Sequence, residues 1–300
     1  MKALWVASIL VFCILVLATF ISRIISFFYT TPELEKVWLR IKSWWIIALL
    51  PLVCLYFGPI AVTALFSVVM IISINEFLKL VDPSFKKHRE VVFFGIPLVV
   101  FAAIISWKMQ SSSWSLVFIF MCFVMLAWAG LVKSKYTVFF GMIFFVSALS
   151  SISILSQSHI EAVFYLLFLT SLNDVFQYLF GKTFGKSKLA PIISPAKTWE
   201  GLLGGVVASG FLSVLLAPYF LTADPITAFL IGVSLSIAGT VGDLTISKFK
   251  RGAKVSDTGS LLPGHGGILD RVDSLCLTAP TFYFIIQAFI PALNLMKGLK

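Results

Sequence analysis

Long apolar runs dominate this chain, and they limit the folds open to it more than any other feature. Of its 300 residues, 59% are hydrophobic and only 12% are charged, whereas soluble domains usually carry about 25% charged residues. A soluble fold of this length could not bury so much apolar surface. A bilayer can, because each helical span needs roughly 20 apolar residues. We therefore predict an all-α, polytopic integral membrane protein.

Short polar breaks divide the apolar runs into about ten expected transmembrane helices. The expected spans lie near residues 5–28, 44–57, 59–79, 92–107, 115–132, 137–155, 162–180, 201–221, 226–245 and 274–292. The second and third are separated only by Gly58 and Pro59. We divide the chain into two regions: residues 1–160 hold the N-terminal transmembrane helices, and residues 161–300 form a C-terminal catalytic region.

Basic residues are distributed unevenly between the predicted loops. Most of the 23 lysines and arginines lie in the odd-numbered loops, and the even-numbered loops hold only Lys108. Cytoplasmic loops carry an excess of basic residues, so the odd-numbered loops are predicted to face the cytoplasm, from a multi-pass position in the cell inner membrane. The net charge of +10 then needs no nucleic-acid partner, because no basic stretch is long enough to form a binding groove.

The seventh predicted loop and its flanks carry the first group of polar residues. Asp174 lies inside an otherwise apolar span, where a carboxylate costs roughly 2.5–3.5 kcal/mol, so a functional site is favoured over snorkelling at the helix end. Ser194 and Pro195 are typical of a helix start. Lys197 would then lie in the first turn, where the helix dipole disfavours a cation. Either a bound phosphate resolves this conflict, or the lysine bends out to water.

The ninth predicted loop is richer in acidic residues. Asp243 ends the ninth span, Asp257 follows it, and Asp270 and Asp273 are spaced to share one helix face. Carboxylates gathered at one membrane surface repel one another unless a cation joins them. Oxygen ligands favour Mg²⁺, completed by water and substrate phosphates. Zinc is not expected, because one histidine without cysteine partners is a poor ligand set.

Basic residues and glycines accompany these acids. Four basic side chains can contact phosphate oxygens: Lys248, Lys250, Arg251 and Arg271. Three glycines allow the backbone to approach a ligand closely: Gly264, Gly266 and Gly267. His265 stands between them, and it is either a solvated loop residue or a group that contacts phosphate or moves a proton near neutral pH.

These residues form ordered motifs between residues 173 and 274. The downstream motifs are Ser247-Lys248-Phe249-Lys250-Arg251, Asp257-x-Gly259, Pro263-Gly264-His265-Gly266-Gly267 and Asp270-Arg271-x-Asp273. The upstream motifs are Asn173-Asp174…Tyr178, Phe184-Gly185 and Ser194-Pro195-x-Lys197-Thr198-x-Glu200-Gly201. Together they resemble the phosphatidate cytidylyltransferase family, whose members are also called CDP-diacylglycerol synthases. Glu76-Phe77 is a weaker shared feature.

The resemblance implies a reaction and the groups that serve it. A phosphate oxygen of phosphatidate attacks the α-phosphate of CTP, giving CDP-diacylglycerol and pyrophosphate. The resemblance also implies Mg²⁺ and a homodimer, and it points to Asp243, Asp270 and Asp273 as metal ligands.

We expect a division of roles within the motifs. The expected catalytic residues are Asp174, Lys197, His265 and Asp270. The expected substrate-binding residues are Ser194, Thr198, Lys248, Arg251, Gly264, Gly266, Gly267 and Arg271. Asp174 either shapes the polar cavity or holds a second cation.

Two departures from the family pattern keep other functions open. Ser256 stands where the family usually has lysine, and Gln177 stands where it usually has alanine. These changes suggest a diverged paralogue that acts on another phosphorylated lipid, or a non-catalytic protein that binds lipid or a partner enzyme. A third alternative is a transporter with Asp174 and Asp243 in an ion path, although the chain lacks the paired helix breaks expected of one.

Overall fold

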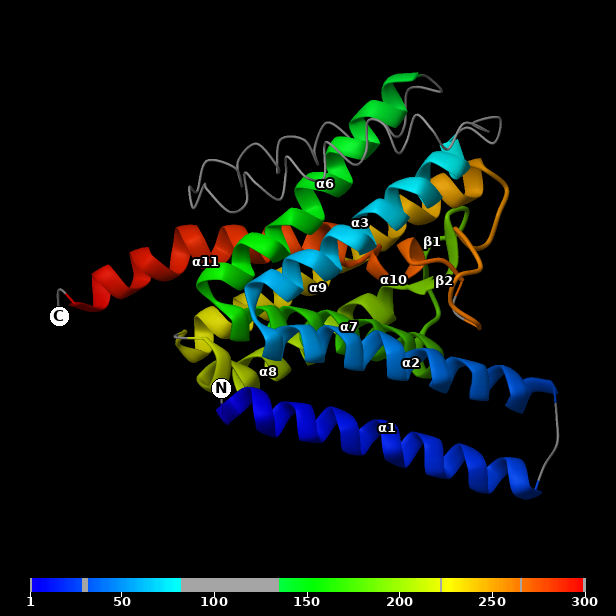
Figure 1. Ribbon diagram of the computed structural model, residues 1–300, viewed down its shortest axis with the longest axis horizontal. Coiled ribbons are helices and arrows are strands. Elements are labelled where there is room, and N and C mark those ends of the chain that lie inside the picture. The colour runs from blue at the N-terminus through cyan, green and yellow to red at the C-terminus, as the bar shows by residue number, and fades with distance from the viewer. Residues whose placement is uncertain (1, 29–31, 82–134, 222, 265, 299–300) are drawn as a thin grey trace.

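The computed structural model describes residues 2–28, 32–81, 135–221, 223–264 and 266–298, and helices make up most of it (Figure 1). The helices are α1 (Lys2–Phe28), α2 (Pro32–Phe57), α3 (Pro59–Val81), α6 (Lys135–Ser158), α7 (Ile160–Phe184), α8 (Trp199–Phe220), α9 (Pro225–Gly252), α10 (Leu269–Val272) and α11 (Leu275–Gly298). Two short strands, β1 (Lys188–Ala190) and β2 (Ser194–Thr198), lie between α7 and α8.

Several of these helices are long and apolar enough to cross a bilayer. Among the described residues there are six, within α1, α2, α3, α7, α8 and α9, and α6 carries a shorter apolar stretch, Phe144–Ser158. Many of their large apolar side chains are exposed, such as Leu203 and Leu215 of α8, as expected for contact with lipid. A helical multi-pass membrane protein is therefore confirmed, but the count of about ten spans is not. The expected spans at 92–107 and 115–132 lie outside the described residues.

Helix boundaries follow local chemistry. Gly58, with a φ of +94°, separates α2 from α3 at the predicted point, because glycine adopts this conformation without steric cost. At the start of α9, the side chain of Asp224 accepts a hydrogen bond from Thr227 N. The helix continues to Gly252 instead of ending near Asp243, so the prediction placed its end too early. Lys250 and Arg251 suit the last turn, where the helix dipole favours cations.

The segment before α8 corrects a second prediction. Ser194 does not begin a helix, because residues Ser194–Thr198 form β2 and pair antiparallel with β1. The helix begins at Trp199, and the N-cap is Thr198, whose Oγ1 accepts a hydrogen bond from Gly201 N at 3.1 Å. Serine followed by proline fits a strand start as well as a helix start, because proline is tolerated at the first residues of a strand. Lys197 is therefore a strand residue.

The helices pack through small residues and aromatic clusters. The helix α8 packs between α7 and α9. A Cβ added at Gly201 would lie 2.7 Å from Gln177 O, so the close approach of α7 and α8 depends on this glycine. On the other side of the bundle, Phe77 of α3 packs against Phe145 of α6 and Phe249 of α9. Figure 1 shows β1, β2 and α10 gathered at one end of the helices, and the polar motifs lie there.

Candidate active site

A cavity of about 590 Å³ opens where α7, α8 and α9 meet the two strands and α10. The charged residues that line it are Asp174, Lys182, Lys197, Asp243, Lys250, Asp257, Asp270, Arg271 and Asp273. Asp174 precedes the end of α7 by roughly 15 Å at the α-helical rise per residue. The cavity therefore extends from the end of the helices into α7, one of the helices long and apolar enough to cross a bilayer.

Three carboxylates lie close enough in this cavity to interact electrostatically: Asp174, Asp243 and Asp273. Ser274 connects two of them, because its Oγ donates to Asp174 Oδ2 at 3.3 Å and its N donates to Asp273 Oδ1 at 2.8 Å. Burial, followed by the charges of Asp243 and Asp174, raises the pKa of Asp273 well above its ordinary range. Asp273 therefore resists ionisation unless a cation lies beside it.

Two lysines enter the same cavity and each forms an ion pair. Lys197 Nζ of β2 lies 2.7 Å from Asp243 Oδ2 of α9. Lys250 Nζ of α9 lies 2.8 Å from Asp270 Oδ1 of α10. Lys197 is half-buried and Lys250 is buried, and their ammonium groups can exchange a carboxylate partner for phosphate oxygens. The site therefore contains the cations that a phosphorylated substrate requires.

Asp270 also holds the segment between α9 and α10. Its Oδ2 accepts hydrogen bonds from Thr258 N at 2.8 Å and Gly267 N at 3.0 Å. Burial opposes ionisation of Asp270, but hydrogen bonds from Lys250, Thr258 and Gly267 outweigh it and lower the pKa. A Cβ at Gly266, where φ is +78°, would approach Asp270 Oδ2 to 2.7 Å. Glycine is thus required here by both conformation and space.

Glu76 of α3 reaches the same segment from the N-terminal region. Its Oε1 accepts from Ile268 N at 3.1 Å, and its Oε2 accepts from Leu269 N at 2.8 Å. Thr258 Oγ1 lies 2.8 Å from Glu76 Oε2 and 3.0 Å from Asp270 Oδ2. Glu76 is buried, so these donors supply the hydrogen bonds that a buried carboxylate needs. The N-terminal region thus helps to position the site.

A line of polar side chains lies behind the cavity and joins α7, α8 and α9. Asn173 Oδ1 accepts hydrogen bonds from Ser236 Oγ at 2.6 Å, Ser209 Oγ at 3.1 Å and Gln177 Nε2 at 3.2 Å. Gln177 Nε2 also donates to Thr240 Oγ1 at 2.8 Å. Gln177, which departs from the expected alanine, is therefore part of a hydrogen-bond network that connects α7 to α9, in which Asn173 Nδ2 has no partner among the described residues.

A family model described as the cytidylyltransferase family matches residues 38–289. The chain belongs to the cytidylyltransferase family. It is therefore a nucleotidyltransferase, and the resemblance found in its motifs is confirmed. The match begins in α2, so it includes Glu76 as well as the C-terminal motifs.

Individual known proteins are also similar to this chain in sequence. The uncharacterized protein YnbB of Escherichia coli K12 is 33% identical over 298 residues, which cover 92% of this chain and 96% of that protein. The phosphatidate cytidylyltransferase of Rickettsia bellii is 44% identical over 119 residues, 37% of this chain and 52% of that enzyme. The phosphatidate cytidylyltransferase of Staphylococcus aureus COL is 37% identical over 175 residues, 55% of this chain and 66% of that enzyme. The chain thus spans about half to two thirds of the two named enzymes.

In this cytidylyltransferase-family enzyme, most of the predicted site residues lie together. Those that line the cavity are Asp174, Ser194, Lys197, Thr198, Asp243, Asp270, Arg271 and Asp273. Asp270 and Asp273 both line it, although α10 ends at Val272, between them. Gly264 and Gly266 line a second cavity that shares Asp257 and Arg271 with the first. Gly267 is packed against Thr258 and Glu76.

Besides Gly267, two predicted residues within the described part of the chain line neither cavity. Lys248 is exposed on α9. Arg251 has its Nε 3.1 Å from Ile193 O and its Nη1 3.1 Å from Val255 O, so it connects the strand region to the end of α9. His265 lies outside the described residues. The phosphate-binding roles predicted for Lys248 and Arg251 thus gain no support from their positions.

Two residues of the enzyme's site make contacts that the sequence did not predict. Lys250 was expected only to add positive charge, but it pairs with Asp270. Lys250 follows Asp243 by seven residues and therefore lies on the same face of α9. This helical spacing could have indicated that Lys250 enters the site. Glu76 stood out as one acid near the end of an apolar span, yet its partners lie far along the chain, so no local pattern identifies them.

The donor set fits a divalent cation only in part. Within the described portion of the chain, no group of three or more acidic, histidine or cysteine side chains is arranged to hold a metal ion by itself. However, Mg²⁺ commonly uses one or two carboxylates and completes its shell with water and substrate phosphates. Asp273 and Asp243 lie close together, and a cation beside them would relieve their repulsion, so they suit such a site. Asp270 is less suited, because Lys250, Thr258 and Gly267 already occupy its oxygens.

Proposed function

We propose that this enzyme transfers the cytidylyl group of CTP to phosphatidate, giving CDP-diacylglycerol and pyrophosphate for phospholipid synthesis. One observation carries the proposal: a single cavity, sunk into membrane-spanning helices, combines ion-paired lysines with closely spaced carboxylates. Cytidylyl transfer requires positioned phosphates and neutralised charge more than covalent help from the protein. The names of the two aligned enzymes support phosphatidate as the acceptor.

The proposed roles follow from the positions of the side chains. Lys197, Lys250 and Arg271 bind phosphate oxygens, and Thr198 fixes the start of α8 beside them. Asp243 and Asp273 would hold Mg²⁺, with Asp174 next to them. When bound, Mg²⁺ would supply positive charge to the attacking and leaving oxygens.

A lipid acceptor suits the surroundings of the cavity. Tyr178 lines it and is 64% exposed. Leu179 of α7 and Leu203 of α8 are exposed apolar residues on the same helices. Acyl chains can therefore remain in the bilayer while the phosphate enters the polar cavity. We further propose a position in the cell inner membrane, with the cavity facing the cytoplasm where CTP is present. The homodimer remains a prediction.

One alternative rests on the departures from the family pattern. Ser256 Oγ donates to Asp257 Oδ2 at 2.7 Å, so a hydroxyl occupies the position of the usual lysine at the edge of the cavity. A paralogue with a different phosphorylated lipid as acceptor would fit this change. A non-catalytic binding protein is the weaker alternative, because the cavity retains its lysines and acids. Membership of an enzyme family disfavours the ion-coupled transporter.

Pyrophosphate release from CTP by purified protein in detergent tests the proposal. With Mg²⁺ present, phosphatidate should support release, and a panel of other phosphorylated lipids separates the paralogue alternative. Preference for another lipid phosphate would replace phosphatidate as the acceptor. Absence of release with every lipid, from protein shown to be folded, would refute cytidylyl transfer. A gain in turnover on Ser256→Lys would show that this position limits activity.

A further inference from the structure

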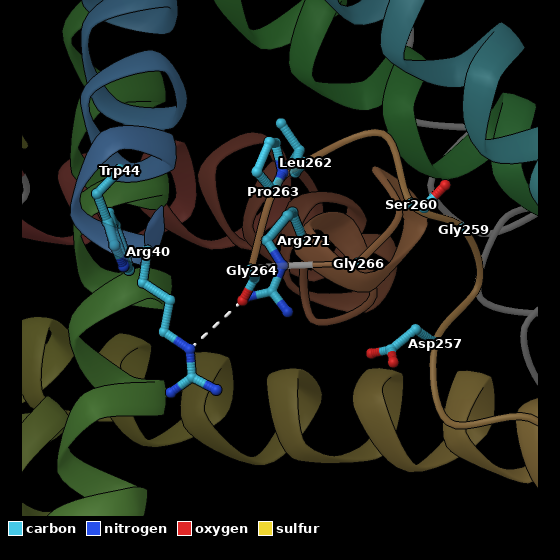
Figure 2. A pocket seen from close by; sticks show the side chains of 10 residues that line it. All are labelled: Arg40, Trp44, Asp257, Gly259, Ser260, Leu262, Pro263, Gly264, Gly266 and Arg271. Carbon is cyan, nitrogen blue, oxygen red and sulfur yellow. Dashed lines mark hydrogen bonds between the residues drawn. The ribbon is translucent and has the colours of Figure 1, made fainter. Parts of the chain in front are cut away.

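A second cavity, of about 740 Å³, lies between α2 and the segment that follows α9 (Figure 2). Its polar lining includes Arg40, Asp257, Ser260 and Arg271, and Trp44 contributes an aromatic ring. Asp257 and Arg271 also line the first cavity. The two cavities are therefore neighbours with a shared wall, and a ligand could extend from one into the other.

The second cavity is a built feature, because α2 is fastened to its opposite wall. Ser43 Oγ donates to Pro263 O at 2.7 Å, and Arg40 Nε donates to Gly264 O at 3.4 Å. A Cβ at Gly264, where φ is +73°, would lie 3.3 Å from Leu39 Cβ. Ser43 is buried at this contact. The first part of the chain thus contributes a wall to a cavity beside the candidate active site.

The balance of acidic and basic side chains differs between the two cavities. In the first, five aspartates face three lysines and one arginine, and both Lys197 and Lys250 are paired with carboxylates. In the second, two arginines face one carboxylate. Figure 2 shows Arg40 and Arg271 extending into the same space beside Gly264, with Asp257 across the opening.

Neither arginine is held by a short contact to a carboxylate within the part of the chain that the structure describes. No ion pair there involves Arg40 or Arg271, and Arg40 donates only its Nε. Asp257 is already an acceptor for Ser256 Oγ. Two guanidinium groups beside one cavity repel each other unless an anion binds between them, and their fixed donors match phosphate oxygens. The second cavity therefore suits a highly charged phosphate group.

We propose that this cavity binds the β- and γ-phosphates of CTP, with Arg40 of α2 as a phosphate-binding residue. The inference rests on the proposed function. In that reaction a phosphatidate oxygen forms a bond to the α-phosphorus, and the bond from that phosphorus to the oxygen bridging to the β-phosphate breaks. The electron pair leaves with pyrophosphate, whose added negative charge Arg40 and Arg271 stabilise.

A lipid phosphate presents the same oxygens to the two arginines as the phosphates of CTP do. The surroundings of the second cavity favour the nucleotide. The first cavity lies beside the exposed apolar faces of α7 and α8, which suit acyl chains. The second is lined by arginines, glycines and the loop at the end of the helices. A lipid phosphate in the first cavity and a pyrophosphate group in the second leave the α-phosphate near their shared wall, where the new bond must form.

The test compares Arg40→Gln with Lys42→Gln. Lys42 is exposed on the same helix and lies 5.2 Å from the Trp38 ring, outside both cavities, so it controls for lost charge on α2. Binding of inorganic pyrophosphate to purified protein in detergent is measured directly, and KM is measured for CTP and for phosphatidate. Arg40→Gln should weaken pyrophosphate binding and raise the KM for CTP by at least about tenfold, because one charge-assisted hydrogen bond is lost. The KM for phosphatidate and all values for Lys42→Gln should stay near those of the wild type.

Two further variants separate binding from positioning. Arg40→Lys should recover part of the pyrophosphate affinity because it keeps the charge. Ser43→Ala removes an anchor of the loop without changing charge, and it should leave pyrophosphate binding largely intact. An equal loss in Ser43→Ala and Arg40→Gln would overturn the direct role of Arg40. Unchanged pyrophosphate binding in Arg40→Gln, or an effect on phosphatidate alone, would also overturn the proposal.

The wild-type protein distinguishes this proposal from the proposed function. If it releases no pyrophosphate with any lipid but still binds inorganic pyrophosphate through Arg40, the anion site stands and cytidylyl transfer to lipid fails. If it turns over CTP normally and Arg40→Gln does not change the KM for CTP, cytidylyl transfer to lipid stands and the anion site fails.

Discussion

Two lysines of the candidate site each lie against an aspartate, and this pairing determines how the site can receive a substrate. Lys197 contacts Asp243 and Lys250 contacts Asp270. A lysine that turns to a substrate phosphate leaves a carboxylate without its cation. For Asp243 a divalent ion can replace the lysine, whereas Asp270 keeps backbone donors. We therefore infer that Lys197 and Asp243 exchange partners when substrate and metal bind.

Lys197→Gln tests this inference. Removing one charged group that stabilises the transferring phosphates should lower kcat by roughly 10²-fold to 10³-fold. Lys188→Gln is the matched control, because Lys188 lies on β1 opposite Thr198 and is exposed. Steady-state pyrophosphate release from both variants gives the comparison. Equal activity of the two variants would show that Lys197 does not contact the reacting phosphates.

Glu76→Gln tests the contact between the N-terminal region and the site. The amide nitrogen of glutamine must face either Ile268 N or the donors Leu269 N and Thr258 Oγ1. At least one buried donor then loses its acceptor, which costs about 1–3 kcal/mol. The thermal midpoint of the purified protein should fall, together with kcat. Ser73→Ala of α3 removes a buried hydroxyl without a partner in the described structure, so its midpoint should not fall; an equal fall in both would argue against the hydrogen bonds of Glu76.

At the scale of elements, the segment between α9 and α10 is held from three directions. Glu76 of α3 and Asp270 of α10 accept its backbone N–H groups, and Ser43 of α2 donates to Pro263 O. Glycines make these approaches possible, because side chains would occupy the space of the carboxylates. The segment is thus fixed by contacts that distant parts of the sequence supply.

Gly267→Ala tests this packing. The added Cβ would collide with Thr258 Oγ1 and with Glu76 Oε2, so the segment must shift, and activity should fall at least about tenfold because catalytic groups tolerate little displacement. Gly252→Ala, at the end of α9, meets nothing within 4 Å and should retain activity. Cytidylyl transfer by the two variants is compared at equal amounts of folded protein. Full activity of Gly267→Ala would mean that the segment does not position the site.

For the whole molecule, the hydropathy pattern predicts those parts of the fold that depend on local sequence. Gly58 ends α2 as expected, and the carboxylates of α7, α9 and α10 converge as their motifs indicated. The strand that contains Lys197 was not predicted, because Ser194 and Pro195 favour both a strand start and a helix start. Arg40 and Glu76 were not assigned to a site, because their partners lie far along the chain and only tertiary packing brings them together.

Divalent metal dependence tests the assignment of the acids. We expect chelation to abolish turnover and Mg²⁺ to restore it. Asp273→Asn should raise the Mg²⁺ concentration for half-maximal activity by at least about tenfold, because a metal site that loses one supporting group typically loses that much affinity. Asp224→Asn at the start of α9 keeps a good N-cap and should not change this concentration. A normal Mg²⁺ requirement in Asp273→Asn would remove Asp273 from the metal site.

Transfer of label from [α-³²P]CTP into an organic-extractable lipid, with purified protein, phosphatidate and Mg²⁺, tests the central claim most directly. The account predicts a labelled CDP-diacylglycerol that forms with the wild type and falls by at least about 10²-fold in Lys197→Gln. A wild-type protein that is folded and yields no labelled lipid with phosphatidate or any other phosphorylated lipid would contradict it.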